Sequence, residues 1–184
     1  MTTPKTAQPL KVYLASPLGF AESTRFFMEK KYKRRIATVS GLKALDPWKE
    51  DPKSSAIIRA AKSVNDLKHR RKAWDRVVLE IGAKNATLID EADGIVAVLD
   101  GVDVDSGTAA EIGYGAAGGK WVIGYRQDLR RTGEDEAAEV NLQVEYFVRR
   151  NGGVIVHTLD QLVNELKRRK RKSKSGTSPI SAAK

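Results

Sequence analysis

Three carboxylates that could act together follow one short apolar run in the middle of the chain. Asp103 and Asp105 lie in the loop after this run, and Glu111 lies six residues beyond Asp105. Two carboxylates that meet in one pocket can carry out glycosyl transfer, one as the nucleophile and the other as proton donor or hydrogen-bond partner of the leaving group. Acidic residues are also common in turns and at helix starts. The spacing alone leaves the chemical and the structural interpretation open.

The elements that flank these carboxylates predict where the side chains meet. Residues 95–99 form a short run of apolar, partly β-branched residues between glycine and aspartate, which predicts a buried parallel strand. Asp105 or Ser106 can cap a helix that begins near Gly107. We therefore expect Asp105 and Glu111 near the carboxyl end of a central strand, where open α/β sheets usually bind ligands.

Strand-like and helix-like segments alternate along the rest of the chain. The other strands are expected at residues 11–15, 41–48, 120–126 and 153–156, and the helices at about 21–36, 54–69, 71–90, 141–150 and 159–171. This alternation predicts an α/β fold with a single doubly wound, five-stranded parallel sheet in the flavodoxin-like order 2-1-3-4-5. A ligand is then expected between strands one and three.

Several short motifs resemble those of the nucleoside 2-deoxyribosyltransferase family. The resemblance covers roughly residues 11–156, most of the expected folded part. The motifs are Asp105-Ser106-Gly107-Thr108-Ala109, Glu111-Ile112-Gly113, Tyr13-Leu14-Ala15-Ser16-Pro17, the stretch 120–126 and Asn141-Leu142-Gln143. As a set they are fairly specific, whereas any one of them alone is weak.

The resemblance implies catalytic roles for three residues. Glu111 matches the nucleophile, Asp105 matches the residue that assists the leaving base, and Tyr13 matches a tyrosine that supports the nucleophilic carboxylate. The loop after Tyr13, with Ser16 and Phe20, would line the base pocket. For Tyr13 the structural alternative is a half-buried strand residue whose hydroxyl has found a partner.

Five further residues are expected to contact substrate. Trp48 ends the second strand, where its ring can stack on a nucleobase or simply pack its loop onto the domain. Asn85 matches a position where family members often have an aspartate that pairs with the base, and an amide both donates and accepts where a carboxylate mainly accepts. Asn141 matches a sugar-site asparagine, sometimes that of a neighbouring subunit, and it can also cap a helix. Small residues including Gly107, next to Ser106, leave room for a ligand at the helix start.

The resemblance implies transfer of the 2-deoxyribosyl group of a 2'-deoxynucleoside to another purine or pyrimidine base, through a covalent glycosyl-enzyme and with retention. No metal or organic cofactor is expected. One alternative is a 2'-deoxynucleoside 5'-monophosphate N-glycosidase, which needs donors for a phosphate dianion. The first loop, residues 16–20, has no basic residue, although Ser106 and Arg126 remain candidate phosphate contacts. The other alternative is a non-catalytic module that binds nucleotides or nucleic acid through residues 167–174.

Composition limits the remaining classes of protein. The 184 residues are enough for one domain; cysteine is absent, and the two histidines lack metal-ligand spacing. Eight of the ten excess positive charges fall after residue 166, which predicts a basic disordered tail (167–184) that binds polyanions weakly. The tail follows a single domain (10–166), and a disordered N-terminus (1–9) is expected before that domain.

Location and assembly are further expectations. Neither a signal peptide nor a membrane-spanning run is apparent, so a cytoplasmic protein is expected. The resemblance implies a homo-oligomer with active sites shared between subunits. In some family members the terminal carboxylate reaches a neighbouring site, whereas this chain ends in a basic stretch at Lys184. How the 5'-hydroxyl of the sugar is held is therefore left open by the sequence.

Overall fold

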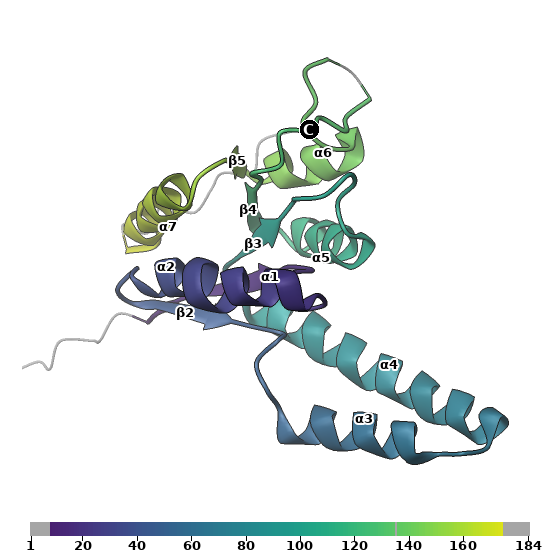
Figure 1. Ribbon diagram of the computed structural model, residues 1–184. Helices are drawn as coiled ribbons and strands as arrows, with labels where there is room; N and C mark the ends of the chain where they lie inside the picture. Colours follow the sequence, from purple (N-terminus) through teal and green to yellow (C-terminus); the bar gives the residue numbers. More distant parts are fainter. Residues whose placement is uncertain (1–7, 135, 175–184) are drawn as a thin grey trace, which may run out of the picture.

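The computed structural model describes residues 8–134 and 136–174 (Figure 1). Its centre is a five-stranded, all-parallel sheet in the order β2-β1-β3-β4-β5. The strands are β1 (Leu10–Ala15), β2 (Leu42–Leu45), β3 (Gly94–Val98), β4 (Trp121–Tyr125) and β5 (Val154–Val156). The fold class and strand order predicted from the sequence are confirmed.

Helices cover both faces of the sheet because successive strand side chains point to opposite faces. Val12 and Leu14 belong to the core beneath α1 (Glu22–Phe27), η1 (Met28–Tyr32), α2 (Lys33–Ala37) and α7 (Leu159–Lys174). Tyr13 and Ala15 belong to the core beneath α4 (Leu67–Glu91), α5 (Ser106–Ala117) and α6 (Leu142–Arg150). Tyr13 is thereby directed to the same face of the sheet as α5.

The first predicted helix, 21–36, is continuous but contains one π-helical turn, η1. Met28, Tyr32 and Ile36 are buried at spacings of four residues. Four residues make slightly more than one α-helical turn, so a wider π turn keeps these side chains on the buried side.

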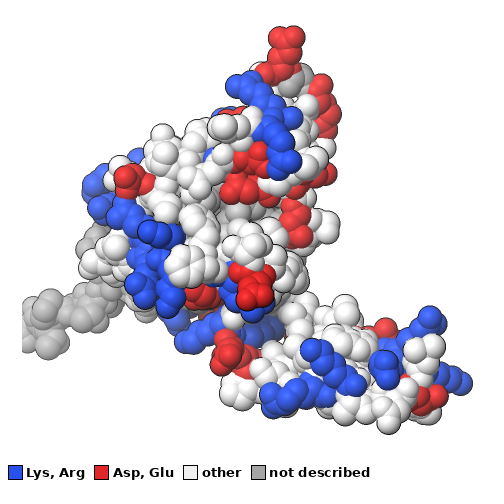
Figure 2. Space-filling model, viewed as in Figure 1, with Lys and Arg blue, Asp and Glu red and all other residues white. Residues whose placement is uncertain are grey.

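Helices α3 (Pro52–Ser63) and α4 form a hairpin that projects from the body of the domain (Figure 1), and Lys and Arg side chains lie along its surface (Figure 2). Ala61 and Val77 are buried in the distal part of the hairpin, whereas Ile89 of α4 packs into the core of the domain. The break between the helices falls at residues 64–66, earlier than predicted, because Asp66 caps α4 by accepting a hydrogen bond from the His69 backbone N–H.

The basic segment from residue 167 is helical as far as Lys174, so the sequence-based boundary of the folded domain at residue 166 falls too early. Leu166 is fully buried and Arg169 is 8% exposed. The Arg169 guanidinium contacts the Trp121 ring, 5.1 Å from its centroid, and pairs with Glu165 at 2.7 Å. Part of the segment is therefore structural. The stretches 1–7 and 175–184 lie outside the described residues.

Within the described ranges, no helix combines the length and apolar character that crossing a membrane requires.

Candidate active site

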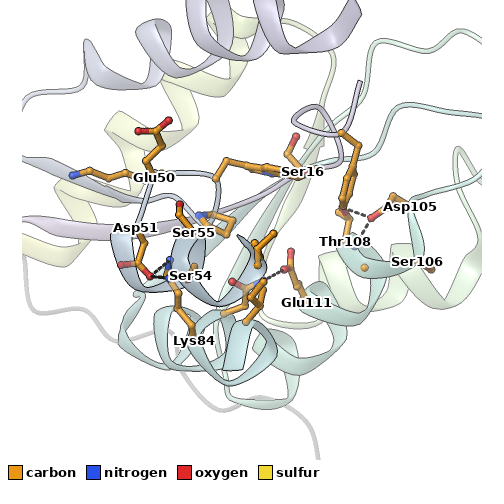
Figure 3. A pocket seen from close by; sticks show the side chains of 18 residues that line it. Ser16, Glu50, Asp51, Ser54, Ser55, Lys84, Asp105, Ser106, Thr108 and Glu111 are labelled. Atoms are coloured by element: carbon orange, nitrogen blue, oxygen red, sulfur yellow. Dashed lines mark hydrogen bonds and ion pairs between the residues drawn. The ribbon is translucent and has the colours of Figure 1, made fainter. Parts of the chain in front are cut away.

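A cavity of about 670 Å³ opens at the carboxyl ends of β1 and β2, between the start of α5 and the base of the hairpin. Its volume is in the range typical of small-molecule sites. Figure 3 shows Glu111 projecting toward its centre, with Asp105 and Thr108 on one side and Ser54 and Lys84 on the other. The sequence-predicted residues that line it are Ser16, Phe20, Trp48, Asn85, Asp105, Ser106, Gly107 and Glu111.

Glu111 lies in the second turn of α5, with its carboxylate in the cavity. The Tyr13 hydroxyl donates a hydrogen bond of 2.6 Å to Glu111 Oε1. Burial raises the pKa of Glu111, the bond from Tyr13 lowers it, and the charge of Asp105 raises it, for a net increase. The carboxylate is thus partly desolvated and oriented by a neutral donor.

Tyr13 is fully buried in β1 and reaches Glu111 from beneath the cavity. Burial and its hydrogen bond to Glu111 raise the pKa of Tyr13 far above its usual value. The hydroxyl therefore keeps its proton and acts as a donor to the carboxylate.

Asp105 is the N-cap of α5. Its Oδ2 accepts hydrogen bonds from the backbone N–H and the hydroxyl of Thr108, at 2.9 and 3.1 Å. This capping role fixes the side chain at the cavity wall rather than competing with a catalytic role. Asp103 instead accepts a bond from the Val104 N–H and is not among the lining residues. Two of the three carboxylates therefore meet in the cavity.

Trp48 forms an aromatic wall together with Phe20. Its indole Nε1 donates to the Ser16 carbonyl at 2.8 Å, and the Phe20 ring meets it edge-on at 4.6 Å. Gly19 allows this arrangement, because a Cβ at that position would lie 2.3 Å from the indole ring. Phe20 is 74% exposed, so this wall borders solvent.

Sequence reasoning missed the wall contributed by the loop after β2 and by the hairpin. Its additional polar members are Lys49, Glu50, Asp51, Ser54, Ser55 and Lys84. Asp51 caps α3, and hydrogen bonds led by that from the Ser54 hydroxyl lower the pKa of Asp51 to about 2. Lys84 lies 3.4 Å from the Asp51 carboxylate. The Asp-Pro pair marks the helix start, but no local signal shows that the hairpin base faces α5.

Two residues with predicted binding roles lie elsewhere. Asn141 caps α6, accepting from the Gln143 N–H, and its amide donates to Glu134 at 2.6 Å. Arg126 is buried, and its guanidinium donates to the carbonyls of Leu99 and Arg130. Arg126 is thus occupied in holding the chain after β4 and does not line the cavity as a phosphate contact. In the described part of the chain, no three His, Asp or Glu side chains are arranged to hold a metal ion.

Two carboxylates that face one cavity at the carboxyl ends of parallel strands are suited to the making or breaking of a glycosidic bond. The family model for nucleoside 2-deoxyribosyltransferases matches residues 12–164. The chain belongs to this family.

Of three similar solved structures, the first two superpose well enough to show the same fold. A conserved protein from Enterococcus faecalis V583 superposes with a TM-score of 0.63 and 24% identity, over 89% of this chain and 99% of its own. A 2-deoxyribosyltransferase from Leishmania mexicana superposes with a TM-score of 0.55 and 20% identity, over 87% of this chain and 98% of its own. A CMP N-glycosidase from Clostridium botulinum gives a TM-score of 0.45 with 18% identity, over 86% of this chain and 98% of its own. No curated protein sequence gave a significant match.

Proposed function

We propose that the protein transfers the 2-deoxyribosyl group of a 2'-deoxynucleoside to another nucleobase, with retention, through a covalent intermediate on Glu111. The observation that carries this proposal is the 2.6 Å hydrogen bond from buried Tyr13 to a cavity-facing Glu111 carboxylate, with Asp105 on the same wall. A poorly solvated carboxylate oriented by a neutral donor suits nucleophilic attack on an anomeric carbon.

In the proposed reaction, a Glu111 carboxylate oxygen attacks C1' of the sugar. The C1'–N bond breaks, its electron pair leaves with the base, and the base takes up a proton with the help of Asp105. A second base then enters and attacks C1' through a ring nitrogen, gives up the proton of that nitrogen with the help of Asp105, and releases Glu111 as a carboxylate. The missing 2'-hydroxyl eases the oxocarbenium-like transition state, which favours deoxynucleosides as donors.

The charges of the cavity favour an unphosphorylated substrate. Its lining includes two lysines and four carboxylates: Lys49, Lys84, Glu50, Asp51, Asp105 and Glu111. This excess of negative charge opposes a phosphate dianion. Arg126, a candidate phosphate contact, is engaged with backbone carbonyls. Hydrolysis of a deoxynucleoside 5'-monophosphate is therefore the less supported activity.

Product analysis tests the proposal. The purified protein is incubated with 2'-deoxyinosine and adenine, and separately with thymidine and adenine, beside samples without acceptor and samples with a deoxynucleotide donor. We expect 2'-deoxyadenosine from at least one nucleoside donor, and none from Glu111→Ala. Free base released only from the deoxynucleotide would assign the hydrolase instead. Transfer by Glu111→Ala at the wild-type rate would overturn the nucleophile assignment.

We further propose that the protein assembles with copies of itself along the hairpin. Leu67, Trp74 and Val78 lie at spacings of seven and four on one side of α4 and are 66%, 37% and 67% exposed. Ile81 continues this side into the cavity lining. A second copy laid along α4 would cover apolar surface that a monomer leaves in water and would border the cavity.

A further inference from the structure

The two carboxylate oxygens of Glu111 have different surroundings. Oε1 accepts the bond from the Tyr13 hydroxyl at 2.6 Å and faces the amide nitrogen of Asn85 at 3.5 Å. In the described part of the chain, Oε2 has no hydrogen-bond donor. The short bond from Tyr13, with the longer Asn85 contact on the same oxygen, orients the carboxylate and leaves Oε2 for bond formation.

Asn85 reaches this carboxylate from a different element than Tyr13 does. It is half-buried on α4, which packs against α5, and it lines the cavity with its amide nitrogen 3.5 Å from Glu111 Oε1. Tyr13 approaches from β1 in the sheet. Glu111 is therefore held between a strand and a helix, and small rotations of its side chain lengthen at least one of the two contacts.

We propose that Asn85 is a positioning residue for Glu111: its amide N–H shares Oε1 with Tyr13, so that Oε2 is the attacking oxygen, and its neutrality adds no further carboxylate beside Glu111. This inference rests on the proposed role of Glu111 as nucleophile. It adds to the base-contacting role expected from the sequence, since the amide can also meet a bound base.

The neutral side chain of Asn85 adds no charge to those that already act on Glu111. Asp105 already disfavours ionisation of Glu111, and burial does so more strongly. The ionisable groups that line the cavity or touch Glu111 from the surrounding elements are Tyr13, Lys49, Glu50, Asp51, Lys84 and Asp105. Lys84 lies beside Asp51, which offsets its charge. An aspartate at position 85 would place a further negative charge next to Glu111 and favour its protonated form.

The test compares Asn85→Asp, Asn85→Leu and a matched control, Asn65→Asp, which makes the same charge change at an exposed site in the hairpin turn. The ionisation of Glu111 is followed by carbon-13 NMR of labelled glutamate, with its signal assigned from Glu111→Gln. The pH dependence of kcat/KM for glycosyl transfer is measured in parallel.

We expect the pKa of Glu111 to rise in Asn85→Asp. It should rise by less in Asn85→Leu, which lacks the donor but adds no charge. In Asn85→Asp, kcat/KM should fall on the acidic side of the profile, by up to roughly tenfold for a rise of one pKa unit, and should recover once the pH exceeds the raised pKa of Glu111. Asn65→Asp should match the wild type in both measurements.

An unchanged Glu111 titration in both Asn85 variants would overturn the positioning role, as would a loss of activity that is uniform across pH. The NMR titration needs no substrate. If the wild type shows no glycosyl transfer or hydrolysis, the proposed function fails while the titration still decides whether Asn85 sets the state of Glu111.

Discussion

Replacing Tyr13 with phenylalanine removes only the hydroxyl that donates to Glu111. The bond is short, at 2.6 Å, and involves a carboxylate in a partly buried site. Bonds to charged groups contribute about 1.5–3 kcal/mol. Since Asn85 still faces the same oxygen at 3.5 Å, we take a value of about 2 kcal/mol, which corresponds to a roughly 30-fold loss of kcat/KM where ionised Glu111 is limiting.

The loss from Tyr13→Phe should depend on pH. Without its donor Glu111 ionises less readily, so the acidic limb of the kcat/KM profile moves to higher pH, and the deficit shrinks once Glu111 is fully ionised. Tyr32→Phe is the matched control, because the Tyr32 hydroxyl is buried with no hydrogen-bond partner among the described residues. That variant should keep the wild-type profile. A Tyr13→Phe profile that coincides with the wild type, or a deficit independent of pH, would refute the reasoning.

Three further results are expected. Burial raises the pKa of Glu111, so folding favours its protonated form, and the wild type loses stability as the pH rises above 4.5, the ordinary pKa of a glutamate. Glu111→Gln cannot ionise and lacks this loss. Although inactive, this variant should resist urea better than the wild type at pH 7 but not at pH 4. Gly19→Ala should displace Trp48 and raise KM for the nucleoside more than it lowers kcat, and an unchanged KM would contradict the proposed aromatic wall. Val78→Glu should reduce the oligomer mass in light scattering, whereas Val102→Glu, equally 67% exposed but in a loop, should not; equal masses would exclude the hairpin interface.

Much of the fold was predictable because its signals are local. The apolar run at 95–99 and the glycines and caps that bound it predict a buried strand and the helix behind it. Alternating strands and helices then leave few topologies, since crossover connections are right-handed. These constraints gave the strand order, and they placed Asp105 and Glu111 at the carboxyl end of β3.

The limits of sequence reasoning appear at residues whose role depends on distant contacts. Nothing local distinguishes Lys49 or Lys84 from solvated lysines. Lys84 reaches the cavity because the hairpin base lies beside α5, and Lys49 reaches it from the loop after β2. Arg126 is a plausible phosphate ligand by type, yet its burial turns it toward backbone carbonyls. Arg169 belongs to a highly basic run, but its contact with Trp121 makes it part of the folded domain.

The sequence by itself determined the residue types and their order along the chain: a strand that carries Tyr13, and a capped helix that carries Asp105 and Glu111. Only the tertiary structure decided that the hydroxyl of Tyr13 and the amide of Asn85 share one oxygen of Glu111. These three side chains come from β1, α4 and α5, and the physical reason is that hydrogen bonds between such separate elements are fixed by packing across the sheet, which periodicity and capping do not encode.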